Sequence, residues 1–354
     1  MSNDHGHPPP GGWGPPPPGW TPPPAGPTPP PGTWGPPPAP RPVHRPGAVP
    51  LRPLGLGDLY DAAFRTIRHN PQATVGAAVL VAAVAMVVPV LVTSVLTFTV
   101  DLSLLSADSP STESVVGFLG SFGALGVGTL LQQVGLILVA GMVAHVVAAA
   151  AVGRRLSLGE AWRATAGQRL RLVGLAALLL VLTLTVLALY AATYVPVVLL
   201  STATWQVVVY AVLSGLLLVA FMTWFWIRVY YLPAPALMME GLTIRQALRR
   251  GYGLTRGAFW RTFGIALLTV VLTGVASSVL TLPFSFGGQL ALLAVGPEYQ
   301  VLGLVLLQAL STVVSTAFVA PFTTAVTALQ YLDLRIRREA YDVDLMTQAG
   351  ITRP

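Results

Sequence analysis

Six long apolar runs dominate the sequence and limit the folds that it can adopt. A helix that crosses the ~30 Å hydrocarbon core of a bilayer needs about 20 apolar residues. Only 9% of the 354 residues are charged, whereas soluble domains carry about 25%. The chain is therefore predicted to be an all-α polytopic membrane protein with six transmembrane helices, at residues 73–100, 127–152, 172–199, 205–232, 262–284 and 300–330. Residues 115–126 and 282–297 are each compatible with a loop, an interfacial segment or an extension of a neighbouring span.

All 20 basic residues are arginines, and they lie on one side of the predicted spans. Nineteen occur before the first span, in the loops 153–171 and 233–261, or after the last span, whereas the loops 101–126 and 285–299 contain none. The remaining one, Arg228, ends the fourth span beside four aromatic residues and is expected to snorkel to the same surface. Because arginine-rich loops stay in the cytoplasm, we predict a multi-pass protein of the cell membrane with both termini cytoplasmic.

The first 53 residues differ from the rest because they hold 22 of the 32 prolines. Proline fixes φ and removes backbone donors, so this segment is predicted to be disordered, with polyproline II character. It is either a passive tail or a docking segment for a protein partner that binds proline-rich peptides. The predicted organisation is a cytoplasmic tail 1–53, a six-span membrane domain 54–338 and a short cytoplasmic C-terminal tail 339–354.

A short motif precedes the first, third and fifth spans. It reads "GLGDLYDAAFRTIRHNP" from Gly55, "SLGEAWRATAGQRLRL" from Ser157 and "TIRQALRRGYGLTRGAFW" from Thr243. The serine or threonine that begins the second and third copies, with a glutamate or glutamine three residues later, fits the capping box of a helix N-terminus. The glycine and aspartate of the first copy are a weaker version. We therefore predict three hairpin repeats, each preceded by a cytoplasmic amphipathic helix.

Wound at about 100° per residue, the motif places apolar residues on one face and arginines on the other. The predicted apolar face is Leu56, Leu59, Tyr60, Ala63, Phe64 and Ile67 in the first copy, and Ile244, Ala247, Leu248 and Gly251 in the third. Such helices either lie in the membrane interface or pack on the inner end of the bundle. In the interface, the arginines would contact anionic lipid phosphates or an acidic partner. The predicted contact residues are Arg65, Arg68, Arg163, Arg245, Arg249, Arg250 and Arg256.

The segment "LPAPALMMEGLTIRQALRRGYGLTRGAFWRTFG" resembles the signature region of the membrane domain attached to some glycerophosphoryl diester phosphodiesterases. The segment "RPLGLGDLYDAAFRTIRHNP" is similar to the first part of that domain, and the resemblance covers about residues 50–340. It implies a stand-alone six-span member of this membrane-domain family, many of which carry proline-rich N-terminal tails in actinobacteria. The hydrolase of that family is a separate barrel domain, so the resemblance implies the membrane domain only.

The predicted spans contain few groups that carry chemistry. His145, in "GMVAHVVAAA", is either a proton relay or ligand contact or a side chain hydrogen-bonded to a neighbouring helix. Gln132 and Gln133 are expected to form interhelical hydrogen bonds. The chain has no cysteine, and no carboxylate lies near the centre of a span; no metal, cofactor or catalytic residue is predicted. Nucleic acid is a poor fit as a partner because no aromatic-rich soluble domain accompanies the arginines.

Three functions fit these features. The first is a non-catalytic membrane protein that organises partners or lipids, anionic ones above all, at the cytoplasmic membrane. The second is a small transporter or lipid carrier that uses a cavity between the hairpins. The third is the membrane subunit of a split phosphodiesterase whose hydrolase is a separate chain. We expect the first.

Overall fold

Every element that the structure describes is a helix. The computed structural model describes residues 47–99, 112–201, 203–296, 299–348 and 350, all of which belong to one compact unit, Val43–Pro354. Most of the predicted proline-rich tail, residues 1–46, lies outside the described residues. The elements are α1 (Leu56–His69), the π-helix η1 (Gln72–Gly76), α2 (Ala77–Thr99), α3 (Thr112–Ala151), α4 (Leu158–Ala164), α5 (Arg169–Ala192), α6 (Tyr194–Leu200), α7 (Thr204–Phe225), the π-helix η2 (Trp226–Tyr230), α8 (Pro233–Glu240), α9 (Ile244–Thr255), α10 (Phe259–Leu292), α11 (Gln300–Glu339) and α12 (Tyr341–Gln348).

Six helical segments are long and apolar enough to cross a membrane, which confirms the predicted number of spans among the described residues. They are Gln72–Phe98, Gly123–Ala151, Arg169–Leu200, Thr204–Glu240, Phe259–Leu290 and Gln300–Glu339. The two ambiguous stretches of the sequence mostly extend their neighbours, because residues 115–126 continue α3 and residues 282–292 continue α10.

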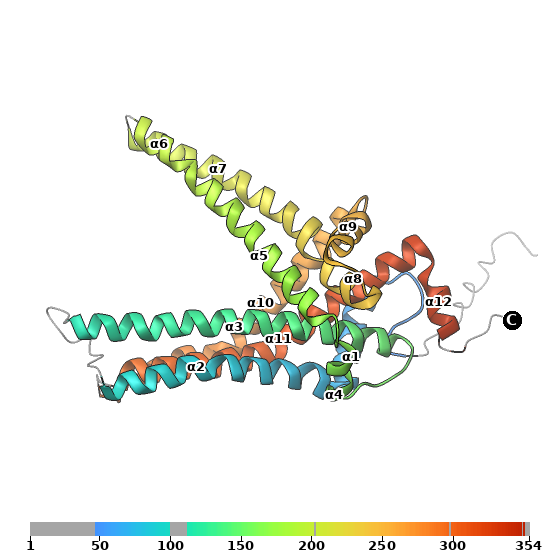
Figure 1. The fold of residues 1–354 in the computed structure, drawn as a ribbon, viewed down its shortest axis with the longest axis horizontal. Helices are drawn as coiled ribbons and strands as arrows, with labels where there is room; N and C mark the ends of the chain where they lie inside the picture. Colours follow the sequence, from blue (N-terminus) through green and yellow to red (C-terminus); the bar gives the residue numbers. More distant parts are fainter. Residues whose placement is uncertain (1–46, 100–111, 202, 297–298, 349, 351–354) are drawn as a thin grey trace, which may run out of the picture. The chain divides into compact units, whose positions relative to one another are not determined.

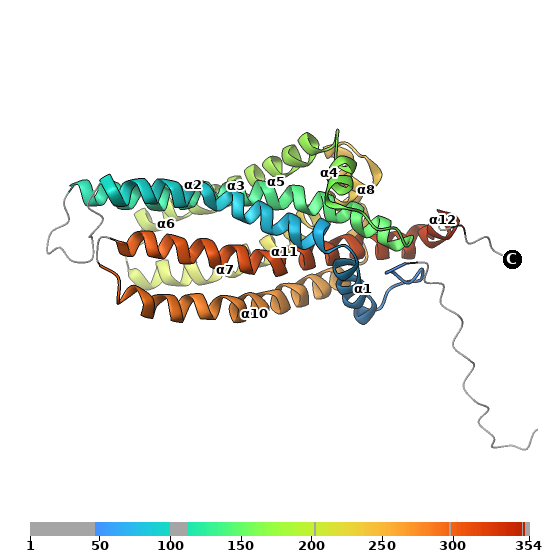
Figure 2. The same cartoon turned by 90° about the horizontal axis from the view of Figure 1, so that it is seen from below.

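Four long helices, α2, α3, α10 and α11, form the packed part of the membrane domain (Figures 1 and 2). In this group α11 contacts the other three, and α2 packs along α3. Gly135 of α3 permits the close approach of α2, because a Cβ at this position would lie 2.2 Å from Cγ1 of Val81. The amide of Gln132 donates to the hydroxyl of Thr316 at 2.9 Å, the interhelical hydrogen bond that the sequence predicts. Small residues and polar bonds of this kind hold helices together in lipid.

The helices α5 and α7 extend away from the packed group in Figure 1 and are mostly exposed. In α5 the buried side chains are Leu172, Leu175 and Leu179, all in its first half. In α7 the buried side chain is Phe225, at its end. The remaining faces of the pair present exposed apolar residues, which is compatible with helices that face lipid. The arrangement of the six spans as three hairpin repeats stays a prediction.

Three short helices begin where the repeated motif predicts them. Helices α1, α4 and α9 each start one residue after the first position of a copy. Before α4, the hydroxyl of Ser157 accepts from the backbone N–H of Glu160, and the backbone N–H of Ser157 donates to the Glu160 carboxylate at 2.8 Å. Before α9, the backbone N–H of Thr243 donates to Gln246 at 3.0 Å. The aspartate of the first copy accepts in the same way. The hydrogen bond from the first position to the residue three positions later is thus confirmed in all three copies, whereas the hydroxyl cap forms before α4 but not before α9.

The buried faces of these short helices differ in part from the predicted ones. Leu56 is 47% exposed and Phe64 is 57% exposed, although both were assigned to the apolar face of α1. The reason is that α1 packs on α11 through the face that contains Leu59, Ala62 and Ala63. Phe64 still contacts Phe322 of α11, with ring centroids 4.8 Å apart. The buried residues are Leu59, Ala62, Ala63 and Thr66 in α1, and Ala247, Gly251, Leu254 and Thr255 in α9.

Segments that the sequence assigned to the two tails are packed on the membrane domain. Val49 is fully buried, and the backbone N–H of Ala48 donates to the carbonyl of Ala150 at 2.9 Å. Near the C-terminus, Leu345 of α12 is buried, and the guanidinium of Arg335 lies 3.6 Å from the ring centroid of Tyr341. The packed region thus includes residues 47–53 and 341–348.

Candidate functional site

A buried carboxylate organises the arginine-rich end of the spans, where α1, α4, α8, α9 and α12 lie (Figure 1). Asp333 of α11 is fully buried and accepts hydrogen bonds from the backbone N–H of Leu54 and from Arg261, both at 2.7 Å. Arg337, one turn further along α11, lies 2.9 Å from the same carboxylate. Both arginines also donate to the carbonyl of Leu54 at 2.7 Å. Asp333 therefore ties the start of α1 to the start of α10 and the end of α11.

A second ion cluster joins α8, α9 and α11 around Glu240. Arg250 of α9 lies 3.1 Å from Glu240 and 2.6 Å from Glu339, and Arg335 lies 3.2 Å from Glu240. The hydroxyl of Tyr331 also donates to Glu240. Partial burial lowers the pKa of Arg250, but its hydrogen bonds to Glu339 and Glu240 outweigh this and raise the pKa above the ordinary arginine value. Arg250, which is predicted from the sequence to contact lipid, thus forms its ion pairs within the protein.

The other predicted contact arginines are exposed on the short helices and their flanks. Arg65 pairs with Asp61 of the same helix at 2.8 Å. No carboxylate of the described residues lies within ion-pairing distance of the other five, which are Arg68, Arg163, Arg245, Arg249 and Arg256. The arginine-rich end therefore presents five arginines that form no ion pair with the described residues.

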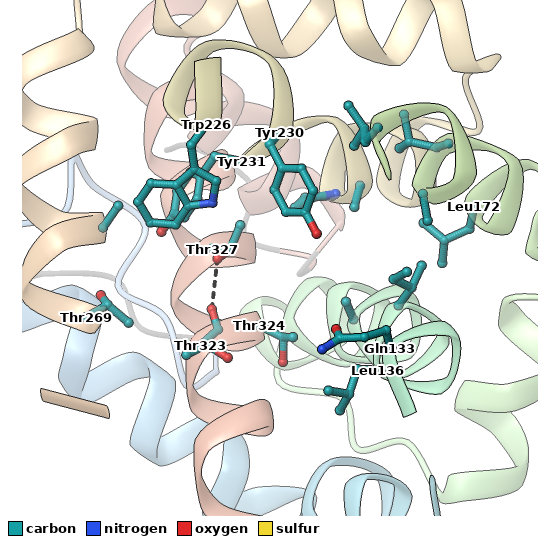
Figure 3. A pocket seen from close by; sticks show the side chains of 18 of the residues that line it. Gln133, Leu136, Leu172, Trp226, Tyr230, Tyr231, Thr269, Thr323, Thr324 and Thr327 are labelled. Carbon is teal, nitrogen blue, oxygen red and sulfur yellow. Dashed lines mark hydrogen bonds between the residues drawn. The ribbon is translucent and has the colours of Figure 1, made fainter. Parts of the chain in front are cut away.

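A cavity of about 290 Å³ lies between α3, α5, the segment from η2 to α8, α10 and α11 (Figure 3). The walls are largely apolar: Ile137 comes from α3, Leu172 and Leu175 come from α5, and Val270 comes from α10. None of the described residues that line the cavity is an arginine, aspartate, glutamate or histidine. The volume is near the lower limit of small-molecule sites, which are typically apolar with a few polar groups.

Polar side chains from several elements also line this cavity (Figure 3). Thr323, Thr324 and Thr327 come from α11, Gln133 comes from α3, and Tyr230 comes from η2. The threonine hydroxyls donate to carbonyls of their own helix, as Thr327 does to Thr323 at 2.8 Å, which leaves their lone pairs free to accept. Gln133 was expected to bond another helix. It makes no hydrogen bond to the described residues in this structure and lines the cavity instead.

His145 does not line the cavity. It lies on α3 six residues before the helix ends at Ala151, a rise of ~9 Å from the arginine-rich end. Its Nε2 is shielded from solvent and has no hydrogen-bond partner among the described residues. The interhelical hydrogen bond that the sequence favours for His145 is therefore not formed at this atom.

Arg228 packs against two aromatic rings. It lies in the π-helical turn η2, and its guanidinium carbon is 5.2 Å from the ring centroid of Tyr252 and 5.6 Å from that of Phe259. Its Nε and Nη1 are shielded and have no acceptor among the described residues. The aromatic rings that Arg228 contacts thus belong to α9 and the start of α10, and its snorkelling to the membrane surface stays a prediction.

No family model, no curated protein and no solved structure matches this chain. Within the described part of the chain, no three histidine, aspartate or glutamate side chains are grouped as a metal site would require. We therefore argue function from two features, the cavity and the exposed arginines.

Proposed function

We propose that this chain is a non-catalytic lipid-binding protein of the cell membrane and that the cavity between α3, α5, α8, α10 and α11 holds a lipid. The chemistry of the cavity carries this proposal, because an apolar lining is combined with an uncharged polar strip formed by the threonines of α11, Gln133 and Tyr230. An acyl chain fits the apolar walls. The hydroxyl or ester oxygens of the same lipid would bond the polar strip.

The absence of charge from the lining favours a neutral group over an ion as the occupant. An unpaired charge that leaves water costs several kcal/mol even after the protein relaxes. The described lining residues offer no side chain of formal charge to offset that cost. A neutral part of a lipid meets no such penalty, so the cavity supports lipid binding over ion-coupled transport.

The exposed arginines support a second type of contact, with anionic headgroups. Arg68, Arg245 and Arg249 lie on the short helices without a carboxylate partner among the described residues. Each arginine near an anionic surface contributes about 1 kcal/mol to membrane attraction. The short helices would then lie at the interface and hold anionic lipids, or an acidic partner, around the spans.

The proposal includes an orientation with both termini in the cytoplasm, as the alternation of arginine-rich and arginine-free loops predicts. Reporter domains fused after Pro110 or Glu298 should then read as extracytoplasmic. Fusions after Arg171 or Arg256 should read as cytoplasmic. A cytoplasmic signal from the Pro110 fusion would overturn this orientation.

Filling the cavity tests the proposed lipid site. Ala176 of α5 lines the cavity, whereas its neighbour Ala177 is exposed. Phenylalanine at position 176 would occupy the space of the acyl chain, so we expect the Ala176→Phe variant to retain several-fold less lipid than wild type. Ala177→Phe adds the same ring outside the cavity and should retain the wild-type amount. Quantitative lipid analysis of protein purified from native membranes in mild detergent measures this, and equal retention by Ala176→Phe and wild type would refute the site.

Lipid transfer is the second candidate function, because the cavity borders α5, a helix that is mostly exposed to the surroundings of the spans. A carrier should accelerate the exchange of fluorescent lipids between the two leaflets of proteoliposomes, and Ala176→Phe should slow that exchange. A protein that only holds lipids should leave the exchange rate at the level of protein-free vesicles.

The resemblance to the membrane domain of glycerophosphoryl diester phosphodiesterases adds a third hypothesis, in which a separate hydrolase chain binds this protein. Affinity purification from native membranes tests this hypothesis. The same experiment tests whether the proline-rich tail is the docking segment. A hydrolase that copurifies with the full chain would support a split enzyme, and its loss on deletion of residues 1–46 would identify the tail as the contact.

A further inference from the structure

A second, separate depression lies on the outer surface of α2 and α3. It is a groove of about 590 Å³ whose lining residues are alanine, leucine, valine, glycine, methionine and tryptophan only. Val81 and Gly135 lie where α2 and α3 approach most closely. Leu80, Val84 and Leu131 line the groove and are each about half exposed. The groove shares no lining residue with the cavity described above.

The length of the groove matches one leaflet of a bilayer. Its lining on α3 extends from Leu131 to Met142, which corresponds to a rise of ~16 Å along the helix axis. Half of the ~30 Å hydrocarbon core is about 15 Å. A single acyl chain of a lipid in one leaflet therefore has the length that this groove accommodates.

The short helix α4 closes the groove at its arginine-rich end. Leu158, Gly159 and Trp162 of α4 complete the lining. The Trp162 ring is held in place by Arg169, whose guanidinium carbon lies 3.6 Å from the ring centroid. Tryptophan prefers the boundary between headgroups and acyl chains, so Trp162 marks the level at which a lipid in the groove would change from chain to headgroup.

Positive charge surrounds this closed end. Arg163 donates to the carbonyl of Gly159, a lining residue, at 3.4 Å, and Arg154 and Arg155 are exposed on the same loop. Glu160 is the only acidic residue between positions 153 and 171. Its carboxylate already binds the backbone N–H and the hydroxyl of Ser157, both at 2.8 Å. Glu160 interacts electrostatically with Arg163 and Arg154, but one carboxylate offsets only one of the three positive charges of Arg154, Arg155 and Arg163, so this end keeps a net positive charge.

We propose that the groove between α2, α3 and α4 is a binding site for an anionic phospholipid, with one acyl chain along α2 and α3 and the phosphate at Arg163 and its neighbours. Charge complementarity selects this occupant over a zwitterionic lipid, because the cationic end of a zwitterionic headgroup would meet three arginines. This site is independent of the cavity lipid, and α4 would act as the helix that selects the headgroup.

The repeated motif supplies a matched pair of variants for the test. Gly159 and Gly57 are each the second residue of a short helix, α4 and α1, and a Cβ at either position would meet no atom within 4 Å. Leucine is therefore tolerated at both positions, but only Gly159→Leu places a side chain at the groove. Val84→Trp, at an exposed wall position of α2, fills the groove from the opposite side if Gly159→Leu fails to accumulate.

Photocrosslinking of the full chain in nanodiscs measures occupancy. Two probes carry the same diazirine acyl chain on phosphatidylglycerol or on phosphatidylcholine, and adducts are mapped by peptide mass spectrometry. We expect phosphatidylglycerol to label residues 131–142 and 158–162 several-fold more than phosphatidylcholine does, while both label α7 equally. Gly159→Leu should remove this excess and Gly57→Leu should keep it. Arg163→Gln should reduce the preference for phosphatidylglycerol but leave labelling by phosphatidylcholine unchanged.

Equal labelling of the groove by the two probes in wild type would overturn the proposal, as would an undiminished excess in both Gly159→Leu and Val84→Trp. Ala176→Phe, which fills the other cavity, should leave labelling of the groove at the wild-type level. Loss of copurified lipid in Ala176→Phe and loss of groove labelling in Gly159→Leu thus report on the two sites separately.

Discussion

The packed helices α2, α3, α10 and α11 and the pair α5 and α7 are alike in apolar character but differ in burial. All six spans have the length and hydropathy of transmembrane helices. In the most apolar 18-residue stretch of α3, half of the residues are buried inside the protein. In the corresponding stretch of the span that contains α7, no residue is buried. Apolar composition therefore predicts which segments enter the membrane and does not predict which of them pack together.

The difference lies in the small residues that permit close contact, because α5 and α7 also share a polar bond, between Tyr190 and Ser214 at 3.1 Å. Between α2 and α3, Gly128 and Gly135 allow helix backbones to approach Pro89 and Val81. Between α10 and α11, Ser277 and Ser315 share a hydrogen bond of 2.7 Å. Lipid chains are as apolar as leucine, so helices associate in a bilayer through such close packing and polar bonds. In α7, a Cβ at Gly215 would meet only the Tyr190 hydroxyl, at 3.9 Å.

The largest expected effect is at Asp333, which anchors the packed group at the arginine-rich end. Asp333→Ala leaves Arg261 and Arg337 without their buried partner, and removal of one member of a buried ion pair typically costs about 3–5 kcal/mol. Asp61→Ala is the matched control, because Asp61 pairs with Arg65 on an exposed surface, where such pairs contribute about 0–1 kcal/mol. Reversible unfolding in mixed micelles measures both. Equal free energies of unfolding for the two variants would contradict the anchoring role of Asp333.

A smaller effect is expected from glycine substitutions, which compare the two groups of helices directly. Gly135→Leu forces α2 and α3 apart, because even a Cβ would overlap Val81, and overpacking of this kind costs about 1–3 kcal/mol. At Gly215 in α7 a Cβ would lie at ordinary van der Waals distance from the Tyr190 hydroxyl, so Gly215→Leu should change the free energy of unfolding by less than about 0.5 kcal/mol. Thermal unfolding of both variants in one detergent measures the difference. A loss for Gly215→Leu as large as that for Gly135→Leu would show that α7 packs more closely than its exposure indicates.

Local patterns were sufficient to predict the helices. The number of spans follows from apolar length, and the starts of α1, α4 and α9 follow from a cap residue and its partner three positions later. The apolar face of α1 was only partly predicted, because the helix periodicity does not say which neighbour the helix meets. Phe322 of α11, which contacts Phe64, is far from α1 in the sequence.

Most of the candidate site could not be predicted from the sequence. Leu54 and Asp333 form a buried hydrogen bond across 279 positions, and no local pattern indicates such a pairing. The arginines were predicted as one class by their charge, but Glu240 and Glu339 engage Arg250 and leave Arg245 and Arg249 exposed. The cavity combines side chains from five segments that are each unremarkable in sequence, such as Thr324 of α11 and Gln133 of α3. The charge pattern thus predicted most of the exposed arginines, whereas tertiary packing determines which residues form the site.

Direct observation of the cavity in a bilayer tests the central claim, that a lipid lies where α5 meets the packed helices. An electron cryomicroscopy map of the full chain in lipid nanodiscs should contain an elongated density between Leu175 of α5 and Thr324 of α11, and this density should be lost in Ala176→Phe. A map in which α5 closes against α11 and side chains fill the cavity, with no density between the two helices, would contradict the account.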